Sequence, residues 1–351
     1  MTTPLNREKA HNVGEGFREH DPRIAYFVKF EATQNFGDYL PELFCKELLL
    51  HPRVEADVYR LVGSVIETAW IWRDLRHATG RTTGKIAYWG CGLRRDKPLV
   101  PAAQASCLFF GVRGPLTRDV LKLPADTVLG DPGLLAPLLH APSSSASTLG
   151  KAVCIPHIQD VKSDEELLAL SGAHHVLRPS IEASETALRT ILDEIAAADF
   201  VLTGSLHGAI VACAYGRPFA FWNSGHVDVP FKWHDFAASV GIPAVFVTTL
   251  DEGRRVYKTE LAPRLTVPAL SPILDVCPFQ VRPSALLRAL AHDGVLEVEL
   301  ARTAAQALEA LPSMRLQNVY GLQDLSTAYR MALRSLGSVL RSNAGQALLQ
   351  A

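Results

Sequence analysis

One stretch of the sequence reads Phe200-Val201-Leu202-Thr203-Gly204-Ser205-Leu206-His207-Gly208-Ala209-Ile210-Val211-Ala212, and it decides the fold. Its first residues are apolar and predict a buried strand, and its small residues predict a tight turn into an apolar helix. A turn of this kind directs free backbone N–H groups at the start of the helix toward a phosphate or carboxylate. We therefore expect an anion site at the carboxyl end of this strand, where open α/β sheets bind their ligands.

His207 lies in the first turn of this predicted helix. With an ordinary pKa of about 6.5, a histidine can supply or remove a proton there, and the positive end of the helix favours its neutral form. The alternative is a histidine that caps the turn or packs against it.

Short apolar runs alternate with helical patterns on both sides of this stretch. Strands are predicted at 24–28, 58–62, 86–90, 106–111, 152–156, 175–177 and 219–222, and helices at 39–50, 66–73, 115–123, 163–170, 184–198 and 209–215. This alternation is typical of an α/β protein with a doubly wound parallel sheet. A serine-rich segment at 140–150 is predicted to be a linker. With 351 residues, two domains are expected.

Composition excludes several classes of function. The net charge is −1, so no basic field attracts nucleic acid. No apolar run approaches the ~18 residues of a membrane-spanning helix, and residues 1–21 lack the pattern of a signal peptide. The six cysteines are scattered, which argues against a disulfide framework or a zinc site. We therefore expect a cytoplasmic globular protein.

Several apparent cofactor motifs fail on inspection. Residues 80–86 have one residue too few between their glycines for a phosphate loop, and Arg95 replaces the third glycine of a dinucleotide fingerprint at 90–95. Ser205 is one place too early for a hydrolase elbow. The chain has no Asp-x-Asp sequence. We therefore expect neither a metal nor a cofactor.

An apolar stripe near the C-terminus predicts an amphipathic helix, with arginines on another face. We favour packing of this helix on the body of the protein or in a homo-oligomer, and the alternative is peripheral contact with an anionic membrane. The stripe consists of Leu325, Tyr329, Ala332, Leu336 and Leu340.

A series of motifs between about residues 24 and 243 resembles the polysaccharide pyruvyl transferases in both order and spacing. The motifs are Asn35-Phe36-Gly37-Asp38, Gly90-Cys91-Gly92, Val112-Arg113-Gly114-Pro115-Leu116-Thr117, Gly130-Asp131-Pro132-Gly133-Leu134-Leu135, Ile155-Pro156-His157, Thr203-Gly204-Ser205-Leu206-His207-Gly208 with Ala214-Tyr215-Gly216-Arg217-Pro218, and Phe231-Lys232-Trp233-His234-Asp235-Phe236. One departure is Ser205, where many relatives carry an arginine. The cation that completes the anion site is therefore left open.

The resemblance implies a fold similar to the two-Rossmann-domain glycosyltransferase B architecture, with the active site in the interdomain cleft. We expect Rossmann-like domains at 22–140 and 151–280 and a helical extension at 281–351. The implied reaction transfers a pyruvyl group from phosphoenolpyruvate to two hydroxyls of a sugar, forming a cyclic ketal and releasing phosphate, in exopolysaccharide biosynthesis. The acceptor is a glycan, free or lipid-linked, and a lipid-linked acceptor would place the enzyme at the inner face of the membrane.

Such chemistry requires two anion pockets, a general acid and a base. His207 is the expected acid or base, Arg113 and Lys232 bind anions, and Asn35 and Asp38 orient the donor or acceptor. The remaining expected binding residues are Ser205, Gly208 and His157. The competing structural roles are a surface ion pair for Arg113, a solvated side chain for Lys232, a helix cap for Asp38 and a structural histidine for His157.

Two other functions remain open. A nucleotide-sugar glycosyltransferase on the same fold would use the same helix N-terminus for a diphosphate. A scaffold that has lost catalysis is the second alternative.

Overall fold

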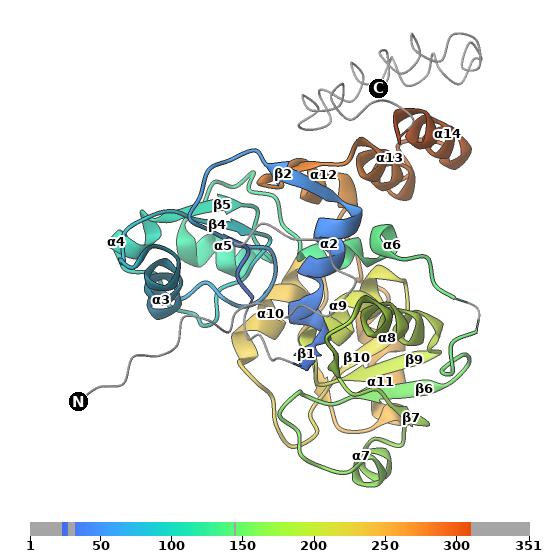
Figure 1. The fold of residues 1–351 in the computed structure, drawn as a ribbon. Coiled ribbons are helices and arrows are strands. Elements are labelled where there is room, and N and C mark those ends of the chain that lie inside the picture. The colour runs from blue at the N-terminus through green and yellow to red at the C-terminus, as the bar shows by residue number, and fades with distance from the viewer. Residues whose placement is uncertain (1–22, 27–31, 144, 310–351) are drawn as a thin grey trace.

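The computed structural model describes residues 23–26, 32–143 and 145–309 (Figure 1). Its larger sheet has five strands in the order β11-β10-β9-β6-β7, and every neighbouring pair is parallel. The strands are β6 (Ala152–Ile155), β7 (His175–Val176), β9 (Phe200–Thr203), β10 (Phe219–Trp222) and β11 (Phe246–Val247). The expected α/β fold with a parallel sheet is confirmed.

Helices cover both faces of this sheet, which is why most residues of its strands are apolar. Alternate residues of β9 point to opposite faces. Phe200 lies against Gly253 of one helix, whereas Thr203 lies against Gly208 of another. The helices around the sheet are α7 (Asp164–Ser171), α8 (Glu185–Ala197), α9 (Leu206–Ala214), α10 (Pro230–Ser239) and α11 (Leu250–Val256), which continues into η2 (Tyr257–Leu261).

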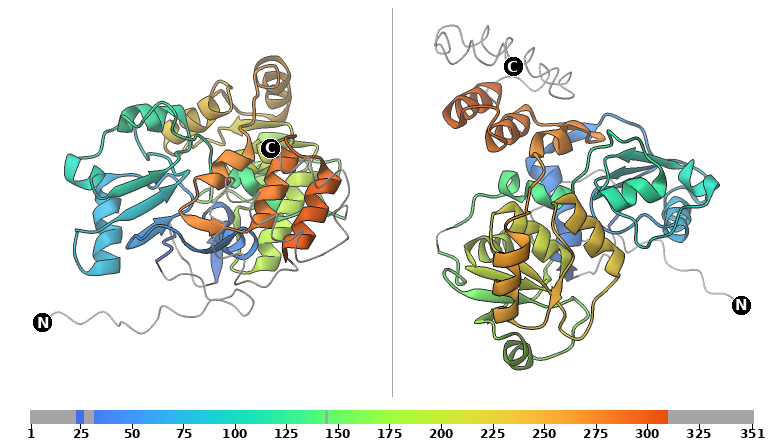
Figure 2. Two further views of the ribbon diagram at one scale, coloured as in Figure 1. Left: turned by 90° about the horizontal axis from the view of Figure 1, so that it is seen from above. Right: turned by 180° about the vertical axis from the view of Figure 1, so that it is seen from behind.

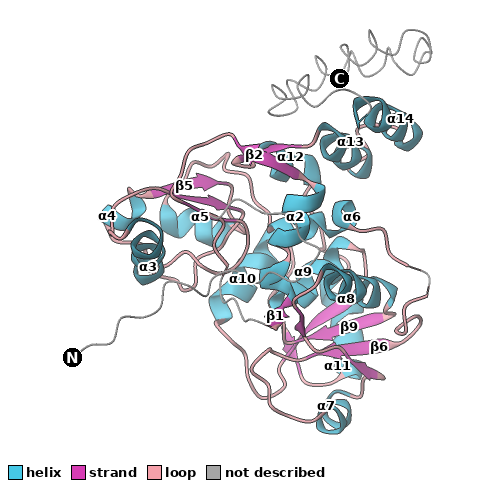
Figure 3. Cartoon of the chain, viewed as in Figure 1, coloured by secondary structure: helices cyan, strands magenta, loops and turns pink. Residues whose placement is uncertain are grey.

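A second parallel sheet, in the order β3-β4-β5, lies on the other side of the molecule, with α2, α9 and α10 between the two sheets (Figure 3). Some apolar residues of this sheet and of its helices form a hydrophobic cluster that is separate from the main core. Its strands are β3 (Val58–Arg60), β4 (Ile86–Trp89) and β5 (Cys107–Phe110), and its helices are α3 (Thr68–Thr79), α4 (Pro101–Gln104) and α5 (Pro115–Leu121). The segment after it forms η1 (Pro132–Leu135) and α6 (Ala136–Leu139).

Two antiparallel strand pairs join distant parts of the chain. β1 (Thr33–Asn35) pairs with β8 (Ser180–Glu182), and β2 (Leu49–Pro52) pairs with β12 (Phe279–Val281). The intervening residues form α1 (Phe36–Tyr39) and α2 (Pro41–Glu47). The prediction of one helix from Tyr39 to Leu50 is therefore wrong at its C-terminal end. The pairing with β12 draws Leu49 and Leu50 into a strand, so a long-range contact overrides the local helical pattern.

The chain ends, within its described part, in a group of helices on the outside of the molecule (Figure 2). They are α12 (Leu270–Asp275), α13 (Pro283–His292) and α14 (Val298–Glu309), and α13 packs against α14. α12 also contacts the smaller sheet, because the Trp89 indole donates a hydrogen bond of 2.8 Å to the Ile273 carbonyl. The predicted stripe from Leu325 to Leu340 lies outside the described residues. No helix among the described residues has the length and apolarity needed to span a membrane.

Candidate functional site

The larger sheet reverses its strand order between β6 and β9. From β6 the chain first adds β7 on one side and then returns to add β9, β10 and β11 on the other. Open α/β sheets bind ligands at the carboxyl ends of the strands at such a switch point. Here β6 ends at Ile155 and β9 ends at Thr203, so the residues that follow them, including His157 and His207, lie at this place.

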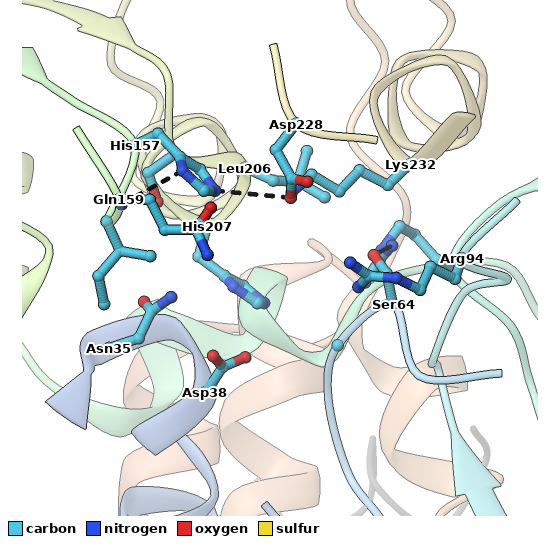
Figure 4. A pocket seen from close by; sticks show the side chains of 14 residues that line it. Asn35, Asp38, Ser64, Arg94, His157, Gln159, Leu206, His207, Asp228 and Lys232 are labelled. Carbon is cyan, nitrogen blue, oxygen red and sulfur yellow. Dashed lines mark hydrogen bonds and ion pairs between the residues drawn. The ribbon is translucent and has the colours of Figure 1, made fainter. Parts of the chain in front are cut away.

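A pocket of about 160 Å³ opens at the switch point (Figure 4). Its walls come from both halves of the chain, because the loops after β3, β4 and β5 and the helix α1 face the ends of β6 and β9. The predicted site residues that line it are Asn35, Asp38, Arg113, His157, Ser205, His207 and Lys232. Gly208 does not line the pocket.

Gly208 instead lets α9 approach the sheet closely. A Cβ atom at this position would lie 2.4 Å from Thr203 Oγ1 and 3.0 Å from Ile155 Cδ1. The Thr203 hydroxyl accepts a hydrogen bond from Ser205 N–H at 3.0 Å and donates one to the Ser205 carbonyl at 2.8 Å, which fixes the turn. Ser205 is the N-cap of α9, and its side chain makes no capping hydrogen bond. The positive end of α9 therefore faces the pocket and suits an anion.

The His207 ring is buried between α1, α9 and η1. A Cβ atom at Gly37 would lie 2.1 Å from His207 Nδ1, so the ring packs directly on the Gly37 backbone. Nε2 is 3.8 Å from Asp131 Oδ1 and has no hydrogen-bond partner among the described residues. Burial lowers the pKa of His207 to about 4, against the opposing effect of Asp131. His207 is therefore neutral near pH 7.

Arg113 is fully buried, so the alternative of a surface ion pair does not describe it. Its Nε donates to Asp131 Oδ2 at 2.8 Å, and Nη1 donates to Ser64 Oγ at 2.7 Å. Nη2 has no partner among the described residues. Asp131 also caps η1, because Oδ1 accepts the Gly133 N–H at 2.9 Å. The guanidinium is thus fixed in place and keeps donor capacity beside the pocket.

A buried contact between α5 and α10 sets the position of Lys232 relative to Arg113. The Asp235 carboxylate of α10 accepts hydrogen bonds from Thr117 N–H at 2.9 Å and from the Thr117 hydroxyl at 2.6 Å. A Cβ atom at Gly114 would lie 2.1 Å from the Asp235 carbonyl oxygen. The glycine and threonine of the motif at 112–117 therefore serve to join these two helices.

Lys232 and His157 share one carboxylate, that of Asp228. Lys232 Nζ lies 2.5 Å from Asp228 Oδ2, and His157 Nε2 lies 3.5 Å from the same oxygen. Gln159 N–H donates to His157 Nδ1, so the ring proton is on Nε2 and points to Asp228. The hydrogen bond from His157, together with Lys232, holds the pKa of Asp228 well below its usual range, and burial lowers the pKa of Lys232. Lys232 is therefore not a solvated surface lysine.

Asp38 lies in α1 and Asn35 immediately precedes it, and the two differ in their roles. Asn35, not Asp38, is the N-cap, because its Oδ1 accepts the Gly37 N–H at 3.2 Å. The half-buried Asp38 carboxylate makes no hydrogen bond or ion pair with any described residue. Burial raises its pKa to about 6, against the opposing effects of Lys232, Arg60 and Arg113.

Ser64, Arg94 and Asp228 also line the pocket and were not predicted from the sequence. Ser64 follows β3 and Arg94 follows β4, each within four to five residues of the strand's last residue. The rule that ligands meet the carboxyl ends of parallel strands would have indicated both. Asp228 lies in a loop without such a signal. Across the described ranges, no group of three or more His, Cys, Asp or Glu side chains is arranged to hold a metal ion.

Residues 62–224 match the sequence model of the polysaccharide pyruvyl transferase family. Searches among curated proteins and among solved structures gave no significant match. The matched segment includes Ser64, Arg94, Arg113, His157 and His207 of the pocket, whereas Asn35, Asp38, Asp228 and Lys232 lie outside it.

Proposed function

We propose that this protein, a transferase whose residues 62–224 belong to the polysaccharide pyruvyl transferase family, transfers pyruvyl groups from phosphoenolpyruvate to a glycan. The family implies the transferase activity and a glycan acceptor. The donor, the cyclic ketal product and the roles of individual residues are our inference from the pocket.

The observation that carries the proposal is the meeting of two anion-binding elements in one pocket. The uncapped N-terminus of α9 faces the same space as the buried Arg113, whose Nη2 has no partner among the described residues. Phosphoenolpyruvate carries a phosphate and a carboxylate, so it needs two such elements. Lys232 and Arg94 add further positive charge along the wall. Arg94 is our candidate for the cation that completes the site where Ser205 replaces an arginine.

The pocket size favours a small donor over a nucleotide sugar. Its volume is about 160 Å³. Pockets for drug-sized ligands typically measure about 300–1,000 Å³. A nucleotide sugar is a ligand of that larger class, whereas phosphoenolpyruvate has only ten non-hydrogen atoms.

We assign the remaining residues by position. His207 takes part in proton transfer, Arg113 and Lys232 hold the donor anions, and Ser205 contributes the backbone at the start of α9. Asn35 and His157 border the space left for the acceptor. We place the enzyme in exopolysaccharide assembly, with a free or lipid-linked acceptor.

We propose that the two parallel sheets are the centres of two Rossmann-like domains, at 22–140 and 151–280, in an arrangement similar to the glycosyltransferase B architecture, followed by the extension at 281–351. The pocket between them supports this, because its walls come from both sheets.

Thermal unfolding with phosphoenolpyruvate or a nucleotide sugar tests the donor. A ligand at ~100 times its dissociation constant stabilises the folded state by about 2.7 kcal/mol. We expect this shift with phosphoenolpyruvate and its loss in Arg113→Lys, because lysine keeps the charge but lacks the second donor arm. Arg118→Lys, at a partly exposed position of α5 that does not line the pocket, is the matched control and should retain the shift.

Release of inorganic phosphate on addition of a glycan acceptor then tests turnover. Stabilisation by nucleotide sugars alone, or phosphate release that does not require the glycan, would contradict the proposal.

A further inference from the structure

Two titratable groups in the pocket have reactive atoms that make no hydrogen bond with any described residue. The Asp38 carboxylate has no hydrogen bond or ion pair with a described residue, and His207 Nε2 has no hydrogen-bond partner among the described residues. Every other charged side chain on the described wall interacts with a neighbouring group, as Arg113 does with Asp131 and Lys232 with Asp228. An ionisable group that is partly desolvated and unpaired in a pocket is a candidate for chemistry.

The backbone brings these two groups together. The His207 ring packs against the backbone of Gly37, and Asp38 is the next residue of the same helix. Figure 4 shows the Asp38 carboxylate and the His207 ring directed into one part of the pocket, while Asp228 and Lys232 occupy another. A ligand anion held by Lys232 and Arg113 would therefore present its reacting carbons to this pair.

The two groups differ in their proton occupancy. Asp38 is surrounded by Lys232 of α10, Arg60 of β3, Arg113 after β5 and Asp131 before η1, and burial outweighs the net attraction of these charges to raise its pKa to about 6. His207 has its pKa lowered to about 4 by burial. At pH 7 the Asp38 carboxyl is therefore protonated in about one molecule in ten, far more often than an ordinary aspartate, while the imidazole of His207 has a free lone pair. One group can thus act as an acid while the other acts as a base.

We propose that Asp38 is the acid that protonates the methylene carbon of phosphoenolpyruvate, and that His207 is the base that accepts the proton of the attacking sugar hydroxyl. This assignment rests on the proposed function. It deepens that function by dividing between two residues the proton transfers that His207 alone would otherwise perform.

Asp38 and His207 each take part in two proton transfers. The electron pair of the C2–C3 double bond takes the Asp38 proton, so the methylene becomes a methyl group and C2 becomes electrophilic. The first hydroxyl oxygen bonds to C2, and its proton moves to His207. The bond from C2 to the phosphate oxygen then breaks, and His207 returns its proton to the leaving phosphate. The second hydroxyl closes the ketal at C2, and its proton restores Asp38.

Binding of the donor favours Asp38 as the acid and His207 as the base. The negative charges of phosphoenolpyruvate disfavour ionisation of Asp38, so they raise its pKa further. They also favour the imidazolium that forms on His207 during the attack. The same charges that Arg113 and Lys232 hold in place thus keep the acid protonated and assist the base.

The test compares Asp38→Asn and Asp38→Glu with Asp126→Asn, an exposed aspartate outside the pocket. We expect Asp38→Asn to lower kcat about 10²- to 10⁴-fold, as general acid catalysis implies. Its KM for phosphoenolpyruvate and its thermal shift with that ligand should stay within a few-fold of the unmodified protein. Asp38→Glu should recover part of kcat, and Asp126→Asn should match the unmodified enzyme.

Two further readouts separate an acid from a structural residue. The kcat of the unmodified enzyme should fall at alkaline pH as Asp38 loses its proton, and this limb should be absent from the residual activity of Asp38→Asn. In D₂O, the unmodified enzyme should place deuterium in the new methyl group. By reversal of the first step, it should also place deuterium at C3 of the phosphoenolpyruvate that is recovered. Phosphoenolpyruvate recovered from the reaction of Asp38→Asn should contain no deuterium.

A kcat for Asp38→Asn within ten-fold of the unmodified enzyme, an unchanged alkaline limb, or unchanged exchange into the donor would overturn the assignment. So would a defect confined to KM. Failure of the proposed function itself is distinguishable, because the unmodified protein would then release no phosphate from phosphoenolpyruvate in the presence of any glycan.

Discussion

Replacing Gly37 with alanine adds one methyl group against the His207 ring. The new Cβ would lie 2.1 Å from Nδ1, 2.3 Å from Cγ and 2.5 Å from Cβ of His207, whereas ordinary contact begins at 3.4 Å. The ring or helix α1 must therefore move by roughly 1 Å. Overpacking of this kind typically costs about 1–3 kcal/mol of unfolding free energy. A displacement of ~1 Å at a reacting group lowers the rate about 10²-fold.

A double-mutant cycle isolates the cause. Gly37 does not have a positive φ, so the backbone accepts alanine and the steric contact alone carries the penalty. His207→Ala is a poor partner variant because its Cβ would still lie 2.5 Å away, whereas His207→Gly removes the three nearest atoms. We expect Gly37→Ala to destabilise the unmodified protein and to have little effect in the His207→Gly background, measured by urea unfolding. Equal destabilisation in both backgrounds would refute this packing argument.

Three more outcomes are expected. Arg113→Met leaves Asp131 buried without its ion-pair partner and should lower the free energy of unfolding by about 3–5 kcal/mol, measured as a lower urea midpoint. An unchanged midpoint would show that the ion pair does not stabilise the fold. Asp38→Asn should stabilise the protein by about 1–3 kcal/mol at pH 7.5 and hardly at all at pH 4. The reason is that the pKa of Asp38 is about 6 in the folded protein and ~3.9 in the unfolded chain. Ionisation of Asp38 therefore lowers the free energy of unfolding as the pH rises through this range, and asparagine cannot ionise. A gain that is the same at both pH values would contradict that linkage. Val229 has a φ of 44° before a proline, so Val229→Gly should raise the melting temperature by relieving strain, while Val229→Ala should not raise it as much.

Local signals in the sequence predicted the parts of the site that depend on neighbouring residues. The strand and helix around Thr203 and Leu206 were predicted because a short apolar run, a small-residue turn and an apolar helix follow one another directly. His157 and Ser205 were found in the same way, at the ends of strands. The proposal of an anion site at α9 needed no information from outside this segment.

Features that depend on distant residues were not predicted. The pairing of β2 with β12 turned Leu49 and Leu50 into a strand, and no local pattern indicated it. Arg113 was predicted as an anion ligand, yet its burial with Asp131 follows only from the way the chain folds around them. The proton state of His207 is likewise set by burial in the assembled protein.

The two antiparallel strand pairs have an evolutionary consequence. A chimera made with a relative by crossing over in the serine-rich segment at 140–150 would divide both pairs, β1 with β8 and β2 with β12, between parents. It would also divide the pocket, with Asp38 from one parent and His207 from the other. The halves of this protein are thus not interchangeable modules, and recombination at the linker would be selected against unless both partners of each pair changed together.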